Sequence, residues 1–408
     1  MRFSDRTAWN LAGNPWSARV AAKRQAGVPL LDLTDSNPTR CDFDYTHAGL
    51  EALADPAARH YRPAARGAPA ARDAVAAYYA AHGIAVDPGA VILTASTSEA
   101  YSYLFKLLAD PGDTILAPTP SYPLFDYLAG LDGVRLVPYP LRYDGAWFLD
   151  FAALAAALPA RARAVILVHP HNPTGVFLKT GERDRLVAFC RAHDLAIICD
   201  EVFLDYGYAP DPARAPSLAG TTAVLTATLS GLSKLAGLPQ VKAGWMVLSG
   251  PAAVREEALR RAEVIADTYL SVSTPVQLAL PRLLESGAAL RAQIRARLRA
   301  NRATLDRLLA GDQPLQALPA EGGWYATLQV PALRTEEAWT LTLLEADDLL
   351  VHPGYFFDFP SGCLLVLSLL PPPAVFTTGV TRLIARVAAV VAAPEDDTPA
   401  RAIAPTTR

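Results

Sequence analysis

Six short runs rich in Val, Ile and Leu recur through the middle of this 408-residue chain, and segments with helical spacing separate them. The runs are AVILTA (90–95), DTILAP (113–118), RAVILVHP (163–170), LAIICDE (195–201), TAVLTATLS (222–230) and GWMVLSG (244–250). Because they lack the polar alternation of half-exposed strands, they predict strands that are buried on both faces. Strands that alternate with helices favour an α/β fold, in which helices cover both faces of an open, mostly parallel sheet.

The composition excludes several classes of protein. Hydrophobic residues make up 51% of the chain and charged residues 19%, which is typical of a globular protein. The net charge of −3 gives no reason to expect nucleic acid or an anionic membrane as a partner. The cysteines are too scattered for a disulfide framework and form no CxxC pair, so we expect no metal site and a reducing, cytoplasmic environment. They are Cys41, Cys190, Cys199 and Cys363.

Neither end of the chain resembles a targeting segment. The first twenty residues carry charges and tryptophans where a signal peptide needs a continuous apolar region. No later segment reaches the ~18 uninterrupted apolar residues of a membrane helix. Residues 393–408 combine Pro with charged residues, which is typical of a frayed tail.

Polar residues follow several of the predicted strands, where the ligands of parallel sheets bind. After the first run, Ser96 and Glu99 stand three residues apart at a helix start and form a possible capping box. The amides and hydroxyls of Thr97 and Ser98 would then offer a phosphate the positive end of a helix dipole. An ordinary helix cap explains the same residues equally well when the segment is taken alone.

Three later features have the same two interpretations. HPHNPTG (169–175) contains Asn172 and is either a site or a turn. Asp200 ends a buried strand, where a carboxylate needs either a structural ion pair or a cationic ligand. Lys234 follows Ser233 in a glycine-rich loop and, taken alone, is a solvated lysine.

Taken together, these features resemble the class I/II aminotransferases, which are fold type I pyridoxal-5'-phosphate enzymes. The resemblance covers roughly residues 30 to 390, and its strength lies in the coincidence of nine weak motifs in the family's order. The motifs are DSNPT (35–39), YRPAARG (61–67), LTASTSEA (93–100), PGD (111–113), PSYP (120–123), HNPTG (171–175), CDEVF (199–203), SKLAGLP (233–239) and KAGW (242–245).

The resemblance implies a catalytic role for two residues. Lys234 would form a Schiff base with the cofactor aldehyde and later move a proton, which requires an amine of lowered pKa. Asp200 would face the pyridine nitrogen and keep it protonated, so that the ring accepts electrons. Asn172 would bind the ring hydroxyl oxygen, and Tyr122 would stack on the ring. Thr97, Ser98, Ser233 and Lys242 would bind the phosphate, and Tyr61 would reach the phosphate of a neighbouring subunit in a homodimer.

The chain also departs from the family's pattern. Phe203 stands where the family usually carries a tyrosine that bonds the ring oxygen. Val366 stands where an arginine usually binds the substrate α-carboxylate, and an isopropyl group cannot replace a bidentate guanidinium. We expect other substrate contacts from Ser36, Asn37, Arg40 and His352, with Arg40 as first candidate for the carboxylate. Exposure of Arg40 and packing of His352 are the alternatives.

The resemblance implies a large domain with a mostly parallel seven-stranded sheet and a smaller α+β domain built from both termini. We expect an N-terminal arm and part of the small domain at 1–45, the large domain at 46–285, the small domain at 286–392 and a flexible tail at 393–408. The expected activity moves an amino group between an amino acid or amine and a 2-oxo acid. A lyase, decarboxylase or cyclase is the alternative because of Val366, and a cofactor-binding transcription regulator is a remote third.

Overall fold

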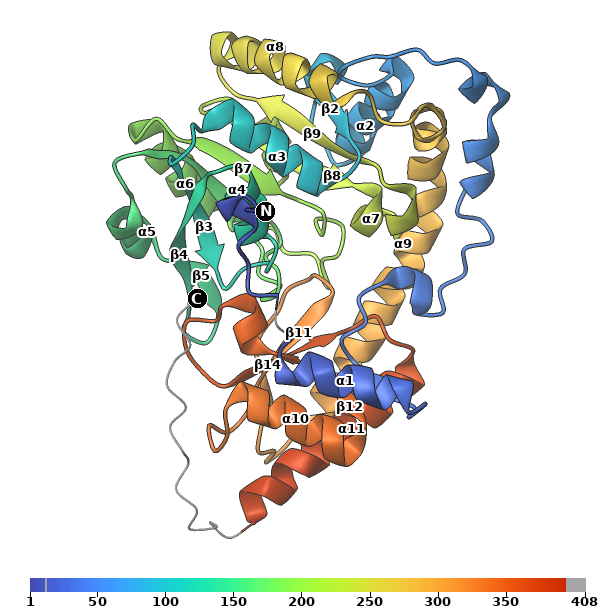
Figure 1. Ribbon diagram of the computed structural model, residues 1–408, viewed down its shortest axis with the longest axis vertical. Coiled ribbons are helices and arrows are strands. Elements are labelled where there is room, and N and C mark those ends of the chain that lie inside the picture. Colours follow the sequence, from blue (N-terminus) through green and yellow to red (C-terminus); the bar gives the residue numbers. More distant parts are fainter. Residues whose placement is uncertain (12, 394–408) are drawn as a thin grey trace.

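The large sheet of this computed structural model has eight strands in the order β2-β9-β8-β7-β6-β3-β4-β5 (Figure 1). The structure describes residues 1–11 and 13–393. The strands are β2 (Val91–Thr94), β3 (Thr114–Thr119), β4 (Arg135–Tyr143), β5 (Trp147–Leu149), β6 (Ala162–Val168), β7 (Ala196–Asp200), β8 (Thr226–Gly231) and β9 (Gly244–Ser249). The pairs from β8 through β7, β6 and β3 to β4 are parallel, whereas β9 is antiparallel to both of its neighbours. All six predicted strands are present, and the predicted α/β class is confirmed.

The expectation of seven strands is wrong by one, because the chain turns back after Tyr143 and adds the three-residue β5 as an antiparallel edge. The run at 135–143 was not predicted as a strand. It contains Pro138 and Pro140, which interrupt an apolar pattern, and several of its residues are exposed. Proline is tolerated there because β4 lies next to the sheet edge.

Helices cover both faces of the large sheet, as the apolar runs predict (Figure 1). On one face, α3 (Thr97–Leu108), α4 (Phe125–Leu131) and α8 (Ala252–Tyr269) pack on the side chains of Ile92, Ile166 and Met246. The opposite face is covered by α2 (Pro69–Ala81), α5 (Phe151–Ala157) and α6 (Thr180–Ala192). Successive strand residues point to opposite faces, so a strand that is buried on both sides is apolar throughout.

A smaller four-stranded sheet lies below the large one in Figure 1, with the order β10-β11-β14-β13. Its strands are antiparallel and packed against the C-terminal helices. The elements are β10 (Gln316–Ala317), β11 (Tyr325–Gln329), β13 (His352–Pro353), β14 (Leu364–Ser368), α10 (Glu336–Asp347) and α11 (Pro373–Ala392). The N-terminal helix α1 (Pro15–Gln25) packs on α10, and β1 (Leu31–Asp32) pairs with β12 (Leu349–Leu350). Segments from both termini therefore build this part, as predicted.

Helix α9 (Thr274–Leu308) joins the two parts and runs without a break across residue 285, where we expect the boundary between the large and small domains. The precise domain bounds stay a prediction. The predicted flexible tail at 393–408 lies, apart from residue 393, outside the described residues.

Helix α11 is long and apolar enough to cross a membrane by its length and composition. No other helix among residues 1–11 and 13–393 meets that test. Two arginines, Arg382 and Arg386, interrupt its apolar sequence. In this structure Phe376, Val380 and Leu383 are buried in the core of the smaller part, so packing of one helix face accounts for much of the apolar character.

Candidate active site

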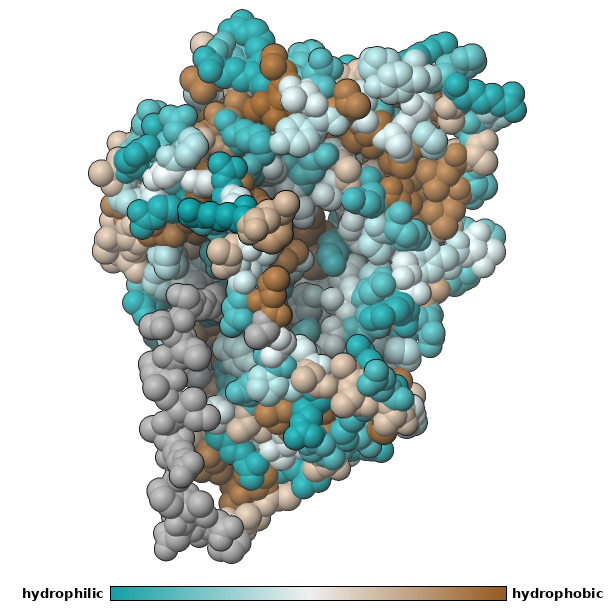
Figure 2. Space-filling view, viewed as in Figure 1, coloured by the Kyte–Doolittle hydropathy of each residue, from teal (hydrophilic) through white to brown (hydrophobic). Residues whose placement is uncertain are grey.

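A cavity of about 180 Å³ opens at the carboxyl ends of the central parallel strands. In the space-filling view, this face is hollowed between the large sheet above and the smaller sheet below (Figure 2). Segments far apart in the sequence meet in this cavity, which we call the central pocket. Its lining residues are Ser36, Thr97, Ser98, Tyr122, Phe125, Val168, Asn172, Asp200, Val202, Phe203, Gly231, Ser233, Lys234, Ala243 and Tyr325.

The N-terminus of α3 forms one wall of the central pocket. Ser96 caps the helix, because its Oγ accepts a hydrogen bond of 3.2 Å from the amide of Glu99. The Glu99 carboxylate reaches one residue further back than in a capping box and accepts from the amide of Ala95 at 2.6 Å. The first amides of an α-helix have no partner within the helix, so those of Thr97 and Ser98 are oriented to bind an anion.

Gly244 brings β9 against this helix start. A Cβ atom at Gly244 would lie 3.0 Å from the carbonyl carbon of Ser96 and 3.1 Å from the amide nitrogen of Thr97. Both atoms belong to the backbone and cannot move aside like a flexible side chain. Glycine is therefore required here for the strand and the helix to approach so closely.

Asp200 ends β7 on the floor of the central pocket. Its Oδ1 accepts a hydrogen bond of 3.1 Å from the amide of Val202, and its Oδ2 accepts one of 3.1 Å from the hydroxyl of Tyr101. Burial raises the pKa of Asp200 from 3.8 to about 6, although these hydrogen bonds and the charge of Lys234 act in the opposite direction. A positive group in the pocket would offset that desolvation.

Lys234 lies in the short helix α7 (Leu232–Leu235), directly after β8. Its Nζ is 5.0 Å from the ring centroid of Trp324 and 6.0 Å from that of Phe203. Burial lowers the pKa of Lys234, and the nearby negative charge of Asp200 opposes this effect. A buried amine of lowered pKa is a nucleophile and a base, so Lys234 has the chemistry that the resemblance implies.

The loop that carries Asn172 is held by the segment before β11. The amide of Glu321 donates to the carbonyl of Gly175 at 3.0 Å, and the amide of Gly175 donates to the carbonyl of His171 at 2.7 Å. Gly175 has φ of +71°, and a Cβ atom there would overlap the carbonyl oxygen of Gly322. The two backbones are therefore in direct contact, and this contact fixes Asn172 in the pocket wall.

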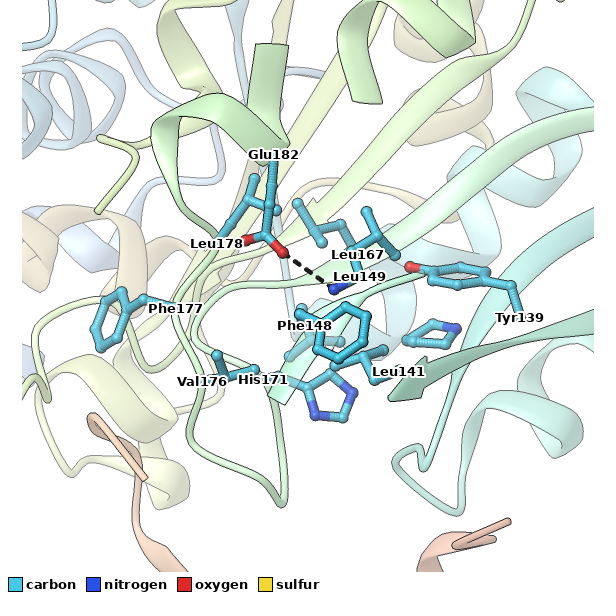
Figure 3. Close-up of a pocket in the computed structure, with 12 residues that line it drawn as sticks. Tyr139, Leu141, Phe148, Leu149, Leu167, His171, Val176, Phe177, Leu178 and Glu182 are labelled. Atoms are coloured by element: carbon cyan, nitrogen blue, oxygen red, sulfur yellow. Dashed lines mark hydrogen bonds between the residues drawn. The ribbon is translucent and has the colours of Figure 1, made fainter. Parts of the chain in front are cut away.

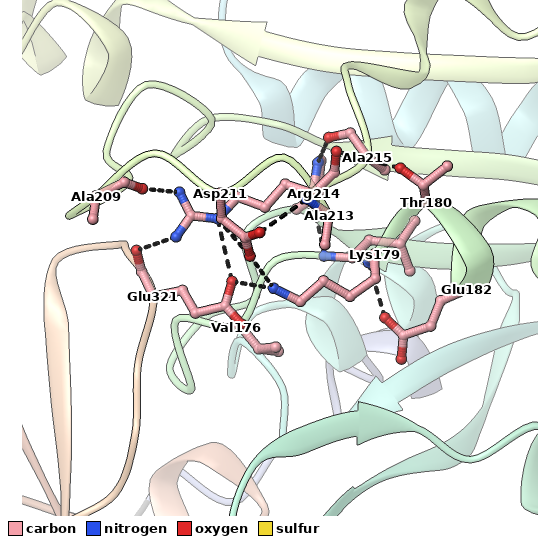
Figure 4. Close-up of polar contacts among 12 residues, drawn as sticks. Val176, Lys179, Thr180, Glu182, Ala209, Asp211, Ala213, Arg214, Ala215 and Glu321 are labelled. Carbon is pink, nitrogen blue, oxygen red and sulfur yellow. Dashed lines mark hydrogen bonds and ion pairs between the residues drawn. The ribbon is translucent and has the colours of Figure 1, made fainter.

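Four charged side chains secure the same contact from the outside (Figure 4). Glu321 accepts hydrogen bonds from Nζ of Lys179 at 2.7 Å and from Nε of Arg214 at 3.2 Å. Asp211 accepts a second bond from Lys179 at 2.8 Å. Because Glu321 is four residues before the pocket residue Tyr325, this ion-pair cluster ties the smaller part of the molecule to the Asn172 loop.

A second, smaller cavity lies behind the same loop (Figure 3). Tyr139, Leu141 and Phe148 are among its mostly apolar lining residues, and Val168 lines both cavities. Nδ1 of His171 lies 2.9 Å from the Thr174 hydroxyl. Burial lowers the pKa of this imidazole to about 3, so it stays neutral and acts as a packing element of the loop.

Comparison with known proteins decides the family. The family model described as "Aminotransferase class I and II" matches residues 34–366. The chain belongs to the class I and II aminotransferases. It is similar to arginine–pyruvate transaminase AruH of Pseudomonas aeruginosa, with 30% identity over 377 residues, or 88% of this chain and 91% of that protein. It also resembles glutamate-pyruvate aminotransferase AlaA of Escherichia coli K12, with 30% identity over 64% of this chain and 66% of that protein.

Solved structures agree on the fold. Alanine aminotransferase from Pyrococcus furiosus superposes with a TM-score of 0.87 at 22% identity, covering 95% of this chain and 100% of that one. An aminotransferase from Escherichia coli gives 0.83 at 24% identity, covering 95% and 98%. The predicted family, fold class and aminotransferase activity are thus confirmed. The family uses pyridoxal 5'-phosphate.

The structure of this aminotransferase gathers most of the predicted site residues in the central pocket. They come from the helix start of α3, the loops after β3 and β6, the ends of β7 and β8, and the N-terminal segment. Their roles stay predictions. The predicted residues in the lining are Ser36, Thr97, Ser98, Tyr122, Asn172, Asp200, Phe203, Ser233 and Lys234.

Five predicted site residues lie outside this lining. Arg40 is 63% exposed and pairs with Asp35 at 3.0 Å, while the side chain of Asn37 accepts from the amide of Thr39. Tyr61 and Lys242 are exposed on the surface of this chain.

His352 is the fifth, and it packs between aromatic rings. Its ring centroid is 5.9 Å from that of Phe357 and 6.4 Å from that of Trp16, and burial lowers its pKa. This is the packing alternative for His352, just as the surface pair of Arg40 is the exposure alternative. Their proposed contacts with substrate stay predictions.

Val366 lies fully buried in β14, where it pairs with Thr327 on one side and His352 on the other. The pocket lining formed by the described residues contains no arginine, and Lys234 is its one basic residue. The lining formed by these residues therefore offers no guanidinium to a substrate carboxylate.

Sequence reasoning missed three aromatic residues of the site. Phe125 and Tyr325 line the central pocket, and Tyr101 bonds the Asp200 carboxylate from behind it. Tyr101 follows Thr97 by four residues, so helical spacing alone places it on the same face of α3. Tyr101 and Asp200 are 99 residues apart in the sequence. Their contact depends on how α3 packs on β8 and β9, which no local pattern in the sequence indicates.

Proposed function

We propose that this aminotransferase binds pyridoxal 5'-phosphate in the central pocket and holds it covalently through Lys234. The observation that carries the proposal is the meeting of Lys234 and Asp200, two buried and oppositely charged groups, in one pocket. The free amides at the start of α3 lie in the same lining. An amine, a carboxylate and an anion site are the three groups that such a cofactor needs.

The pocket residues fit this cofactor. Oδ1 of Asn172 is buried without a hydrogen-bond partner among the described residues. Buried polar atoms usually have a partner, so this oxygen is available to a bound molecule. Gly231 lets the end of β8 lie against the backbone before β9, because a Cβ atom there would be 2.8 Å from the carbonyl oxygen of Ala243.

When bound, pyridoxal phosphate supplies an aldehyde that takes up the amino group and a ring that stabilises negative charge on the adjacent carbon. The amine of Lys234 would carry a proton from that substrate carbon to the cofactor carbon that bears the amino group. Asp200 would keep a proton on the ring nitrogen. Tyr122 would cover the ring face, and Thr97 and Ser98 would hold the phosphate.

The substrates of an aminotransferase are an amino compound and a 2-oxo acid. Three of the four relatives named above have pyruvate or alanine in their names, so we propose the alanine–pyruvate pair as one half of the reaction. The side chains of the pocket lining would set the preference for the other amino donor. Because no arginine is among the described lining residues, hydroxyls and amides would bind the donor carboxylate. Ser36 and Asn172 in the lining are the candidates.

We further propose a homodimer and a cytoplasmic location. Tyr61 is 66% exposed and is not among the lining residues of its own pocket, which supports a role at the neighbouring subunit's phosphate. All four cysteines are buried and unpaired, which supports a reducing compartment. Light scattering of the holoenzyme tests the dimer. Tyr61→Phe should weaken cofactor affinity and leave the dimer intact.

A panel of amino donors tests the reaction. With donor and no acceptor, transamination predicts at most one 2-oxo acid released per active site, and turnover resumes when pyruvate is added. Alanine, arginine, glutamate, an aromatic amino acid and a simple amine cover the relevant chemistry. Sustained release of ammonia or carbon dioxide without an acceptor would instead identify a lyase or a decarboxylase.

A further inference from the structure

Tyr101 places a phenol beside Asp200 in the interior of the large domain. The side chain is only 2% exposed, and its hydroxyl donates to Oδ2 of Asp200 at 3.1 Å. Oδ1 accepts from the amide of Val202. We infer that Tyr101 is a positioning residue that holds the Asp200 carboxylate toward the ring nitrogen of the cofactor. The inference rests on the proposed function, in which Asp200 meets that nitrogen.

The two hydrogen bonds act on different oxygens of the carboxylate. A single bond from Val202 to Oδ1 would leave the carboxylate free to rotate about its Cβ–Cγ bond. The second bond, from Tyr101 to Oδ2, fixes the plane of the group. Burial raises the pKa of Asp200, and the hydrogen bonds from Val202 and Tyr101 act against this effect, so the Tyr101 hydroxyl both orients the carboxylate and favours its charged form.

Aromatic neighbours hold Tyr101 in turn. Its ring is 5.1 Å from that of Phe125 in an edge-to-face contact and 6.0 Å from that of Phe105. Phe125 also contacts Tyr122 edge-to-face at 6.0 Å. A row of three rings therefore connects the residue proposed to cover the cofactor with the residue that orients Asp200. Such contacts restrict ring rotation and fix the direction of the hydroxyl.

The same helix serves both ends of the cofactor site. Tyr101 follows Thr97 by about one turn of α3, whose first amides are proposed to bind the phosphate. A rigid helix therefore sets the distance between the phosphate site and the carboxylate. Burial raises the pKa of Tyr101 well above its ordinary value of 10, so the phenol stays a donor at any pH at which the enzyme works.

Cofactor affinity tests the inference without an activity assay. Wild-type enzyme freed of cofactor is titrated with pyridoxal phosphate and with its carbocyclic analogue, in which CH replaces the ring nitrogen. Quenching of tryptophan fluorescence reports binding, since Trp324 lies next to Lys234. The ratio of the two dissociation constants measures the contact between Asp200 and the ring nitrogen. Tyr101→Phe should reduce that ratio by about 10-fold, the effect of losing one hydrogen bond to a charged group.

Tyr139→Phe is the matched control. Tyr139 is also fully buried and donates to the carbonyl of Ile166 at 2.7 Å, but it makes no contact with Asp200. This variant also loses a buried phenol oxygen, from β4 rather than from α3, and should keep the wild-type ratio. In an Asp200→Asn background, Tyr101→Phe should have no further effect on the ratio.

The outcomes separate this inference from the function on which it rests. A wild-type enzyme that binds both compounds equally would contradict the proposed role of Asp200 itself. A wild-type preference that Tyr101→Phe retains in full would overturn the inference alone. If Tyr101→Phe does not fold while Tyr139→Phe does, the hydroxyl serves folding rather than positioning, and the inference is also wrong.

Discussion

Replacement of Gly175 by Ala tests the backbone contact that holds the Asn172 loop. Gly175 has φ of +71°, and a Cβ atom there would overlap the carbonyl oxygen of Gly322 and lie 2.9 Å from Cβ of Ala320. An L-residue in the left-handed region costs about 1 to 2 kcal/mol. Forcing an additional methyl group into a packed site costs roughly 1 to 3 kcal/mol more. We therefore expect Gly175→Ala to lower the free energy of unfolding by about 2 to 5 kcal/mol.

Gly83→Ala separates the two contributions. Gly83 has φ of +75°, but a Cβ atom there would meet nothing within 4 Å, so this variant loses only the conformational part. The entropy of unfolding of a 408-residue chain is roughly 0.9 kcal/mol/K. The steric part should therefore lower the midpoint of thermal unfolding of Gly175→Ala by about 1 to 3 °C below that of Gly83→Ala. Cofactor affinity should fall in Gly175→Ala alone, because Asn172 moves with the loop. Equal midpoints and equal affinities in the two variants would refute the contact.

Three further predictions concern the charged groups. Lys234→Ala should fold and bind the cofactor noncovalently, but its release of 2-oxo acid should be slower by at least roughly 10²- to 10⁴-fold in a steady-state assay. Burial raises the pKa of Asp200 from 3.8 to about 6, so its protonated form stabilises the cofactor-free protein at low pH, and this contribution is lost as the pH rises through 6. Relative to Asp200→Asn, the cofactor-free wild type should lose about 1.4 kcal/mol between pH 5 and pH 8 in thermal unfolding, and a difference that does not vary with pH would contradict the assignment. Glu321→Gln should destabilise the protein by about 1 to 2 kcal/mol, whereas Glu345→Gln, at an exposed pair, should stay within about 0.5 kcal/mol of wild type in the same measurement.

The fold was largely predictable from the sequence because the buried parallel strands are continuous apolar runs. The run LAIICDE, for example, forms β7 and ends at Asp200, as predicted. The weak point was β4, where Pro138 and Pro140 near the sheet edge removed the apolar signal. Local patterns also found the cap at Ser96, because a helix cap depends on neighbours in the chain.

The site was predictable where a motif lies at a strand end and was not where tertiary packing decides. Asn172 and Lys234 line the central pocket because the carboxyl ends of parallel strands meet at one edge. Tyr101 reaches Asp200 because α3 packs on β8 and β9, and no pattern in the sequence encodes that packing. Arg40, the first candidate for the substrate carboxylate, pairs with Asp35 on the surface of this structure, and its contact with substrate stays a prediction.

Chemical trapping of the cofactor tests the central claim most directly. Borohydride reduction of the holoenzyme, followed by proteolysis and mass spectrometry, locates the lysine that carries pyridoxal phosphate. The account predicts modification of Lys234, the one lysine in the lining of the central pocket. Modification of Lys242, which is exposed, or of Lys106, which pairs with Asp132 from the last turn of α3, would contradict the proposed active site.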